Sequence, residues 1–396
     1  MSARASRPSL PELDERQLRR VRRTVSGFAC PDSAVEVIVE GRALVNFCSN
    51  DYLGLARHPA AAAAMCAAAA RCGVGSGASH LVTGHGAEHE RLEEELAEFT
   101  GRPRALLFST GYMANLAAVG VLAGAGDFVL LDRLSHASLI DAALLARARF
   151  KRFAHADAAD AERLLRDRAD RASGARTTLV ATDGVFSMDG DVAPLVSLAA
   201  SARAHAAWLL VDDAHGLGVL GARGRGLVEE CALTVDDVPL LVGTLGKAFG
   251  SFGAFIAGGE NLLEELLQHA RSYRYTTALP QPVAAATRAT LAIAQRESWR
   301  RERVLALTRR FRSAAREAGI TLGLSATPIQ PVLLGDVSTA LAASAQLFEA
   351  GFWVAAIRPP TVPPDSARLR VTLSAAHSEA QVDALVEVLS RCVRRN

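Results

Sequence analysis

Apolar runs of strand length alternate with helical patterns through the middle of this chain, and this alternation constrains the fold most strongly. The apolar runs predict strands at residues 105–108, 128–131, 178–182, 208–211, 240–242 and 254–257. Helices are predicted between them, for example at 113–122, 137–148 and 194–205. Apolar strands separated by helices are typical of a mainly parallel sheet that is covered on both faces. We therefore expect an α/β fold.

The segments on either side of this region predict further parts. Residues 35–48 alternate in polarity around Glu40-Gly41, which indicates a small hairpin. A long helix is predicted at about 281–318, with room for one break, and strands and helices of a smaller α+β part follow it. We expect three parts: an N-terminal segment at 1–48, a large α/β domain at 49–280, and a linker helix with a small C-terminal α+β domain at 281–396.

The composition argues against several classes of function. With 44 Lys and Arg against 42 Asp and Glu, the net charge of +2 gives no electrostatic case for binding nucleic acid or an anionic membrane. The first twenty residues lack the apolar segment of a secretion signal, and the most apolar helix candidate, 59–70, is too short to span a bilayer. The six cysteines form no CxxC pair, which indicates buried thiols in a reducing cytoplasm. We expect a cytoplasmic protein and no metal ion at its active site.

A glycine-rich loop around one lysine follows the strand at 240–242. In GTLGKAFG (243–250), small residues flank Lys247 on both sides. A lysine is costly to bury unless it is paired or neutral, so a lysine in this apolar setting is a candidate to form a covalent imine. The alternative is a surface loop whose lysine points into water. The loop is not a phosphate-binding P-loop, because it lacks the four-residue gap between glycines and the Ser or Thr after the lysine.

Polar side chains follow another predicted strand, 208–211. Ligands of open α/β sheets bind at the carboxyl ends of the strands, so these side chains are candidate site residues. Asp212 could hold the protonated nitrogen of a pyridine ring and keep the ring electron-withdrawing. His215 could hydrogen-bond a hydroxyl of the same ring. The alternative for Asp212 is an acid that caps a helix or closes a turn.

Three other predicted strands also end in polar residues. Residues 109–112, Ser-Thr-Gly-Tyr, end a strand and begin a helix, where backbone N–H groups and hydroxyls favour a phosphate. Ordinary helix capping by the serine or threonine is the alternative. His136 could stack on a flat ring or cap its own helix, and Ser187 adds a hydroxyl after the strand at 178–182. Together these residues predict a phosphate site, an acid, an imidazole and a lysine at one edge of the sheet.

Residues 216–221, GLGVLG, match the dinucleotide-binding pattern GxGxxG. That pattern requires a helix to begin inside it, and the residues that follow, 222–226, are a poor helix start. A nicotinamide-dependent oxidoreductase rests on this match alone.

With these residues assembled, the chain resembles the pyridoxal-phosphate-dependent α-oxoamine synthases, which have the aspartate-aminotransferase-type fold, fold type I. The similarity runs from about residue 18 to residue 393. Its most specific motifs are SNDYLGLA (49–56), DRLSHASLIDA (132–142), TDGVFSMDGD (182–191), VDDAHG (211–216), GTLGKAFG (243–250) and IRPPTVP (357–363).

The resemblance implies pyridoxal 5′-phosphate as the cofactor and gives each strand-end residue a role. Lys247 would form the imine with the cofactor, and Asp212 would pair with the pyridine nitrogen. His215 would meet the ring hydroxyl, and His136 would stack on the ring and line the substrate site. Further cofactor contacts are implied for Gly111, Tyr112, Ser187 and Thr244.

The resemblance also implies substrate-binding residues. Asn50 and Arg358 would hold the carboxylate of an amino acid, and Thr361 would contact substrate. One N-terminal arginine would reach the acyl substrate, with Arg19 as the best match and Arg20 and Arg22 close to it.

Within the family, the motifs most resemble members that condense L-alanine with a pimeloyl thioester, carried by coenzyme A or an acyl carrier protein, in biotin biosynthesis. Such enzymes are homodimers, and we expect the same here. One alternative is another α-oxoamine synthase that uses glycine or serine with acetyl-, succinyl- or fatty acyl-CoA. Another is a non-catalytic, regulatory member of the fold. His80 in GASHLVTG departs from the family pattern, in which we expect a small residue or an arginine.

Overall fold

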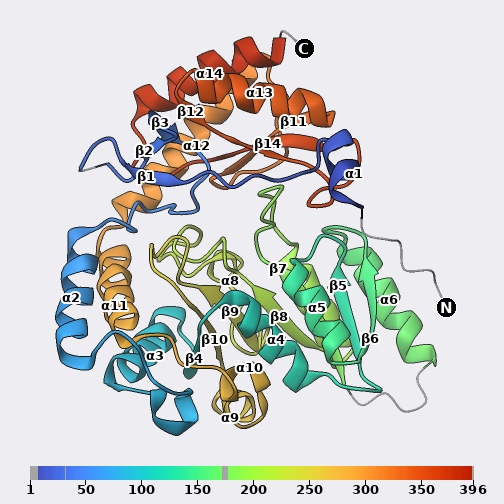
Figure 1. The fold of residues 1–396 in the computed structure, drawn as a ribbon. Helices are drawn as coiled ribbons and strands as arrows, with labels where there is room; N and C mark the ends of the chain where they lie inside the picture. Colours follow the sequence, from blue (N-terminus) through green and yellow to red (C-terminus); the bar gives the residue numbers. More distant parts are fainter. Residues whose placement is uncertain (1–7, 32, 172–176, 395–396) are drawn as a thin grey trace. The chain divides into compact units, whose positions relative to one another are not determined.

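The computed structural model describes residues 8–31, 33–171 and 177–394 (Figure 1). The chain forms two compact units. The smaller unit comprises Met1–Ser49, Met188–Gly190 and Val304–Asn396, and the larger comprises Asn50–Ser187 and Asp191–Arg303. The outer ends of the expected N-terminal and C-terminal parts, residues 1–7 and 395–396, lie outside the described residues.

A seven-stranded sheet in the order β4-β10-β9-β8-β7-β5-β6 forms the centre of the larger unit. Only β10 runs antiparallel to its neighbours, and every other pair of adjacent strands in this sheet is parallel. The expected α/β fold with a mainly parallel sheet is therefore confirmed. The strands are β4 (Arg104–Phe108), β5 (Phe128–Asp132), β6 (Arg149–Phe153), β7 (Thr178–Asp183), β8 (Trp208–Asp212), β9 (Leu240–Thr244) and β10 (Ala254–Gly258).

Helices surround this sheet, and α2 and α11 lie side by side (Figure 1). The expected long helix is divided into α11 and α12 (Trp299–Glu317), as the predicted break allowed. The helices of the larger unit are α2 (Pro59–Cys72), α3 (Ala87–Thr100), α4 (Gly111–Leu122), α5 (Ala137–Leu145), α6 (Ala158–Arg171), α7 (Leu195–Ala204), α8 (Leu227–Glu230), α9 (Glu260–His269), α10 (Arg271–Arg274) and α11 (Gln281–Arg296), with one π-helical turn, η1 (His80–Gly84).

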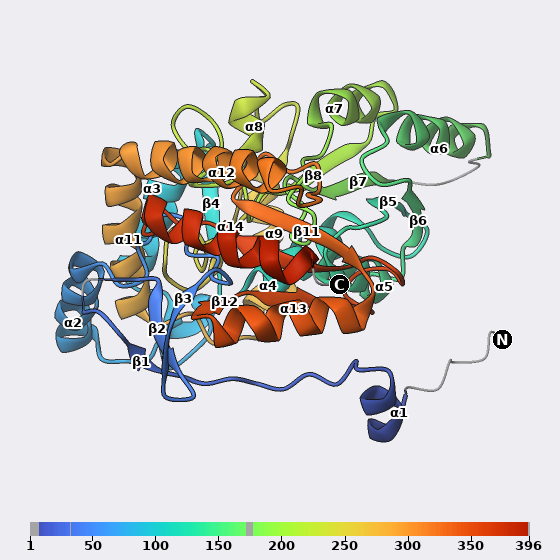
Figure 2. The ribbon, with the colours of Figure 1, turned by 90° about the horizontal axis from the view of Figure 1, so that it is seen from above.

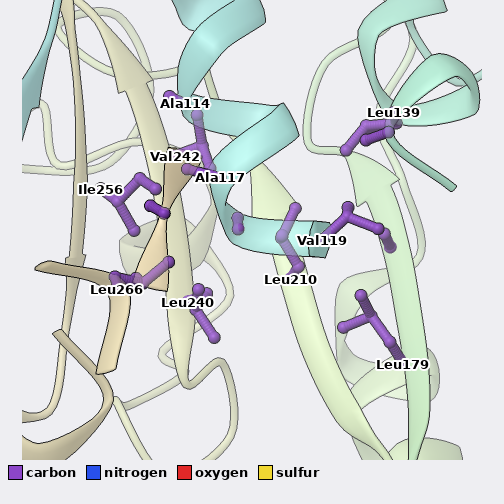
Figure 3. Packing of buried hydrophobic residues seen from close by; sticks show 14 of the residues in the cluster. Ala114, Ala117, Val119, Leu139, Leu179, Leu210, Leu240, Val242, Ile256 and Leu266 are labelled. Atoms are coloured by element: carbon purple, nitrogen blue, oxygen red, sulfur yellow. The ribbon is translucent and has the colours of Figure 1, made fainter. Parts of the chain in front are cut away.

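The apolar core of the larger unit joins α4 to the middle of the sheet (Figure 3). Ala114 and Ala117 of α4 are buried close to Leu210 of β8 and Val242 of β9. Alanines on this face allow the helix to approach the strands closely, because no long side chain separates the two backbones. The helix that begins beside the carboxyl ends of the strands is therefore held firmly against them.

The smaller unit contains two sheets and the C-terminal helices. A four-stranded sheet has the order β1 (Val25–Phe28), β2 (Glu36–Val39), β3 (Arg42–Asn46), β12 (Phe352–Trp353). A three-stranded sheet has the order β11 (Ile329–Gly335), β14 (Ala367–Thr372), β13 (Ala355–Ile357). Figure 2 shows α13 (Val337–Glu349) and α14 (Glu379–Arg394) side by side, and α1 is Leu10–Glu15.

The expected hairpin at 35–48 is present as β2 and β3, and its turn explains its sequence. Glu40 and Gly41 both have positive φ, 53° and 77°, as a two-residue turn with the twist of a hairpin requires. Among the described residues, no helix is both long enough and apolar enough to cross a bilayer.

Gly243 of β9 lies where a single added methyl group should destabilise the fold. An alanine Cβ there would lie 2.4 Å from Cε1 of the buried Phe255 ring and 2.5 Å from Leu217 Cδ1. Overpacking of this kind typically costs about 1–3 kcal/mol, so Gly243→Ala should lower the free energy of unfolding by about that amount. Urea denaturation measures the change.

The matched control is Gly120→Ala on α4, where an added Cβ meets nothing within 4 Å. Alanine is the better helix former by about 0.5–1 kcal/mol, so this variant should be as stable as the parent or slightly more stable. Equal stability of the two variants would contradict the packing assigned to Gly243.

Candidate active site

The carboxyl ends of three neighbouring strands bring the central polar residues together. Asp183 ends β7 and lies opposite Asp212, which ends β8. Asp212 in turn lies opposite Val242 of β9, two residues before that strand ends at Thr244. Lys247 follows in the next turn and is half-buried. The structure therefore places the expected acid and the expected lysine just beyond the ends of adjacent strands.

The Asp212 carboxylate is buried and held by neutral donors. One oxygen accepts a hydrogen bond from Asn115 Nδ2 of α4 at 2.7 Å, and the other accepts from the Ala214 N–H at 3.1 Å. Asn115 Nδ2 also donates to Ser138 Oγ at 2.8 Å. The carboxylate is thus fixed in position by the helix packed beside it, without a guanidinium or ammonium among these partners.

His136 occupies the N-cap of α5 and continues the same chain of hydrogen bonds. Its Nδ1 lies 2.7 Å from Ser138 Oγ and accepts the Ser138 N–H at 3.3 Å, which leaves the ring proton on Nε2. Burial lowers the pKa of His136, the charge of Asp212 raises it, and the charge of Lys247 lowers it. The capping alternative is thus observed. The charges of Asp212 and Lys247 both act on the pKa of the same imidazole.

Asp183 is the second buried acid at this edge. Burial raises its pKa well above the ordinary value, and the nearby charge of Asp212 raises it further. The hydrogen bond that its carboxyl accepts from the His136 N–H, at 2.9 Å, and the charge of Lys247 act in the opposite direction. Asp183 is therefore driven toward its neutral form beside the Asp212 carboxylate.

His215 is buried and held by a residue far away in the sequence. Its Nδ1 lies 2.7 Å from the phenol oxygen of Tyr52, and that oxygen donates to Asn50 Oδ1 at 3.3 Å. The Tyr52 side chain is fully buried. The structure therefore links His215 to Asn50, two residues that the sequence had assigned to different ligands.

The expected phosphate site lies at the start of α4. Thr110 Oγ1 caps this helix by accepting the Met113 N–H at 3.2 Å, so ordinary capping is observed here as well. A Cβ at Gly111 would meet nothing within 4 Å, which leaves space over the first turn. Tyr112 is partly exposed and donates its hydroxyl hydrogen to Asp141.

Thr244 and Ser187 complete the expected cofactor residues of the larger unit. Thr244 Oγ1 donates to the Gly253 carbonyl at 3.2 Å and lies 3.4 Å from the Gly246 nitrogen, so it orders the loop that carries Lys247. Ser187 is half-buried in the segment that follows β7.

The expected substrate residues Arg19, Arg358 and Thr361 lie in the smaller unit. Arg358 Nη2 donates to the backbone oxygen of Arg19 at 2.6 Å, and Arg20 Nη2 donates to Thr361 Oγ1 at 2.8 Å. The side chain of Arg19 pairs with the exposed Asp14 at 2.9 Å. Burial lowers the pKa of Arg358, and the charge of Arg20 lowers it further. The structure thus joins the N-terminal arginines to the IRPPTVP segment.

The GxGxxG pattern has a structural explanation that requires no nucleotide. No helix begins within residues 216–221, and α8 starts later, at Leu227. A Cβ on Gly216 would lie 2.1 Å from Asp213 Oδ1, and one on Gly218 would lie 2.6 Å from the Ala248 Cβ. The glycines therefore admit neighbouring protein atoms, and the nicotinamide alternative loses its only support.

An ion cluster lies at the end of β5, on the same edge of the sheet. His155 Nδ1 is 2.9 Å from Asp132, the last residue of β5, and its Nε2 is 2.8 Å from Asp191. Burial opposes the charge of His155, but its hydrogen bonds to the two carboxylates and their charges raise its pKa to about 10. The imidazolium thus ties the segment after β7 to β5.

The chain matches a known protein family over most of its length. Residues 42–389 match the family model described as aminotransferase class I and II. The chain belongs to the class I and II aminotransferase family.

Two relatives with more than half of their residues identical carry the same name. A protein of Pseudomonas putida (strain KT2440) named 8-amino-7-oxononanoate synthase is 60% identical over 357 residues, 90% of each chain. A protein of Methylococcus capsulatus (strain Bath) with the same name is 57% identical over 385 residues, 97% of each chain. The resemblance carried by the sequence motifs is therefore confirmed.

Solved structures share the fold at lower identity. A serine palmitoyltransferase variant from S. paucimobilis, described with a bound adduct of PLP and myriocin, is 30% identical with a TM-score of 0.91, covering 98% of this chain and 99% of that one. A crystal structure of 8-amino-7-oxononanoate synthase from Francisella tularensis is 30% identical with a TM-score of 0.76, covering 89% and 98%. The expected fold of pyridoxal-phosphate enzymes is confirmed.

Several supporting residues were missed by the sequence analysis, namely Asn115, Ser138, Tyr52 and Asp183. Tyr52, Ser138 and Asp183 lie inside family motifs, and Asn115 lies in the predicted helix 113–122. Nothing in the sequence indicated which side chain each of them would hydrogen-bond. The available signal was a single amide in the otherwise apolar run of α4, because a buried amide requires a hydrogen-bond partner.

Tyr52→Phe tests the support of His215. The variant keeps the buried ring and removes only the oxygen beside His215 Nδ1. A hydrogen bond contributes about 0.5–1.5 kcal/mol, so affinity for the cofactor should fall by about two- to tenfold. Equilibrium titration of the apoenzyme with cofactor measures the change. Tyr275→Phe, at an exposed tyrosine of the same unit, should leave the affinity unchanged.

His155 should contribute to the stability of the fold in a pH-dependent way. Its pKa rises from about 6.5 in the unfolded chain to about 10 in the fold, so the folded state binds the proton more tightly. The stabilisation is complete below pH 6.5 and is lost as the pH rises toward 10. The free energy of unfolding of His155→Gln should therefore fall furthest below that of the parent near pH 6, and the gap should narrow by pH 9.5. A gap independent of pH, or equally large for the exposed His269→Gln, would contradict this assignment.

Proposed function

We propose that this chain condenses L-alanine with a pimeloyl thioester and releases CO₂ and the free thiol, which yields 8-amino-7-oxononanoate for biotin biosynthesis. The geometric support is that Asp212 ends β8 beside β9, the strand that Lys247 follows, while Asp183, opposite Asp212, accepts the His136 N–H at 2.9 Å. The relatives with 57–60% identity support the choice of substrates. The serine palmitoyltransferase structures are more distant, at 30–33% identity.

The cofactor is pyridoxal 5′-phosphate, as the sequence led us to expect. When bound, it supplies an aldehyde that bonds amines and a ring that withdraws electrons from the carbon being deprotonated. The residues present fit this group: a buried carboxylate with only neutral donors suits a cationic ring N–H, and the open space over Gly111 suits a phosphate at a helix N-terminus. Asn115 Oδ1, which has no hydrogen-bond partner among the described residues, offers a further acceptor beside Asp212.

In this proposal, the Asp212 carboxylate accepts a hydrogen bond from the protonated ring nitrogen of the cofactor. Asn115 fixes the carboxylate, and Asp183, driven toward its neutral form, does not compete for that proton. His215 meets the ring hydroxyl and is oriented through its Nδ1 by Tyr52. Gly111, Tyr112, Ser187 and Thr244 bind the remainder of the cofactor.

Lys247 carries the proton transfers. Its amine would hold the cofactor at rest. Once the amino group of L-alanine has taken its place, the freed amine would remove the Cα proton and return a proton after CO₂ is lost. The lowered pKa of His136 keeps its imidazole neutral, so it adds no second positive charge beside the lysine and presents a flat face to the ring and the substrate.

The substrate-holding residues are those that the family resemblance implies. We assign the alanine carboxylate to Asn50 and Arg358, because a guanidinium binds a carboxylate through two parallel hydrogen bonds. Thr361 contacts substrate, and Arg19 reaches the acyl chain once its exposed pair with Asp14 opens. We also propose that the enzyme is a cytoplasmic homodimer, as the family resemblance implies, and that the acyl carrier is coenzyme A or a carrier protein.

The deciding experiment is product identification. Incubation with L-alanine and pimeloyl-CoA should give 8-amino-7-oxononanoate by mass spectrometry. Glycine with acetyl-CoA or succinyl-CoA, and serine with palmitoyl-CoA, should give at most traces. Faster turnover of any of these pairs would replace the proposed substrates, and a purified protein without cofactor or turnover would favour the regulatory alternative.

The attachment site has an unusually sharp test, because the chain contains only two lysines, Lys151 and Lys247. Borohydride reduction followed by peptide mapping should find the cofactor on the Lys247 peptide alone. Lys247→Ala should lower turnover by at least about 10²–10⁴-fold, the usual contribution of a general base. Lys151→Ala, at an exposed residue of β6, should keep full activity. Unchanged turnover in Lys247→Ala would remove the lysine from the mechanism.

A further inference from the structure

A cluster of histidines and glutamates in the larger unit has no part in the proposed reaction. It lines a cavity of about 310 Å³ whose walls include His80, His85, Glu90, Glu93 and Tyr273. His80 is the residue that departs from the expected family pattern. The cluster therefore calls for an explanation of its own.

Three of these side chains converge at one point. His85 follows directly after η1, and Glu90 and Glu93 lie three residues apart on α3, so both glutamates occupy the same side of that helix. His85 Nε2 is 2.9 Å from Glu90 Oε2. One possible ligand atom from each of the three residues lies within 4.8 Å of the other two.

We propose that His85, Glu90 and Glu93 bind one divalent transition-metal ion, with Zn²⁺ as the best match. Imidazole nitrogen and carboxylate oxygen are preferred zinc ligands, at about 2.0–2.2 Å from the ion. Ligand atoms at that distance in a tetrahedron are about 3.4 Å apart. The 2.9 Å separation of His85 from Glu90 therefore needs to widen only slightly to admit the ion.

The surrounding residues support these three ligands. The Leu107 N–H donates to Glu93 Oε1 at 2.7 Å and fixes that carboxylate. With Nε2 of His85 on the ion, its ring proton lies on Nδ1, which is 2.9 Å from His80 Nδ1. His80 is stacked on Tyr273 with ring centroids 4.8 Å apart, which holds its Nδ1 in place to accept a hydrogen bond from that N–H. Partners of this kind orient ligands and strengthen metal binding.

The alternative ligand group is His80, His85 and His89, and the existing hydrogen bonds of His89 argue against it. Its Nδ1 accepts the Gly86 N–H at 3.0 Å, and its Nε2 lies 2.6 Å from the Leu279 carbonyl oxygen. Whichever nitrogen bound an ion would first have to give up its backbone partner.

The charges around the cavity also favour a cation. Glu94 adds a third carboxylate to the lining. Arg104 is the one lysine or arginine among the lining residues, and its charge is paired with Glu264 at 2.7 Å. An ion here would link the turn η1 to α3 without touching the Lys247 loop.

The test uses the untagged holoenzyme after treatment with a chelator and dialysis. Calorimetric titration with Zn²⁺, and metal analysis after gel filtration, should give about one ion per chain. His85→Ala and Glu93→Gln should each weaken binding by at least tenfold. His80→Ala should weaken it by about 10–100-fold, the usual effect of removing a residue that supports a ligand. Circular dichroism and cofactor absorbance establish that each variant is folded.

His269→Ala is the matched control, because His269 lies 3.3 Å from Glu265 in an exposed pair on the same unit. Its affinity for Zn²⁺ should equal that of the parent. The proposal is overturned if the parent shows no saturable binding, or if folded His85→Ala and Glu93→Gln bind as tightly as the parent. None of these measurements depends on turnover, so the outcome is separate from that of the proposed reaction.

Discussion

The site depends on one buried negative charge, the carboxylate of Asp212 at the end of a central strand. A carboxylate removed from water is costly unless hydrogen bonds or a cation compensate it. Here Asn115 and a backbone N–H supply the hydrogen bonds, and the packing of α4 on the sheet fixes Asn115 in turn. Asp183 lies beside Asp212 and is driven toward its neutral form, so in the proposed function Asp212 is the acid left to meet the ring nitrogen of the cofactor.

The sequence predicted the buried, apolar strands of the sheet well and missed the charged strand at one of its two edges. The six predicted strands of the larger unit are apolar apart from the two threonines at the ends of 178–182, which made them visible as short runs. The strand that was missed, β6, reads RFKRF, and its charged Arg149, Lys151 and Arg152 hide the pattern. These charges have a physical reason, because β6 is an edge strand and charges discourage pairing with another chain. The amphipathic α6 was missed as well.

For the site, the sequence predicted the residues at strand ends but not the residues that hold them. Lys247 and Asp212 were expected because each follows an apolar run, and ligands gather where such runs end. Their supports come from distant segments: Asn115 is 97 residues from Asp212, and Tyr52 is 163 residues from His215. No local pattern encodes a contact of that span. The glycines at 216–221 illustrate the same limit, because a missing Cβ admits a nucleotide or a neighbouring side chain equally well.

Two hydrogen bonds within the smaller unit join segments that are implied to bind substrate. Arg358 donates to the backbone of Arg19, and Arg20 donates to Thr361, so the N-terminal segment and the IRPPTVP segment are joined over 339 and 341 residues of chain. Replacing Arg358, or either Arg20 or Thr361, would remove one of these two hydrogen bonds. In the proposed function, the residues that bind substrate therefore include members of both segments, whereas the strand ends of the larger unit hold the cofactor. This division is consistent with a fold that is retained at 30% identity, while the relatives with one common name are 57–60% identical to the chain.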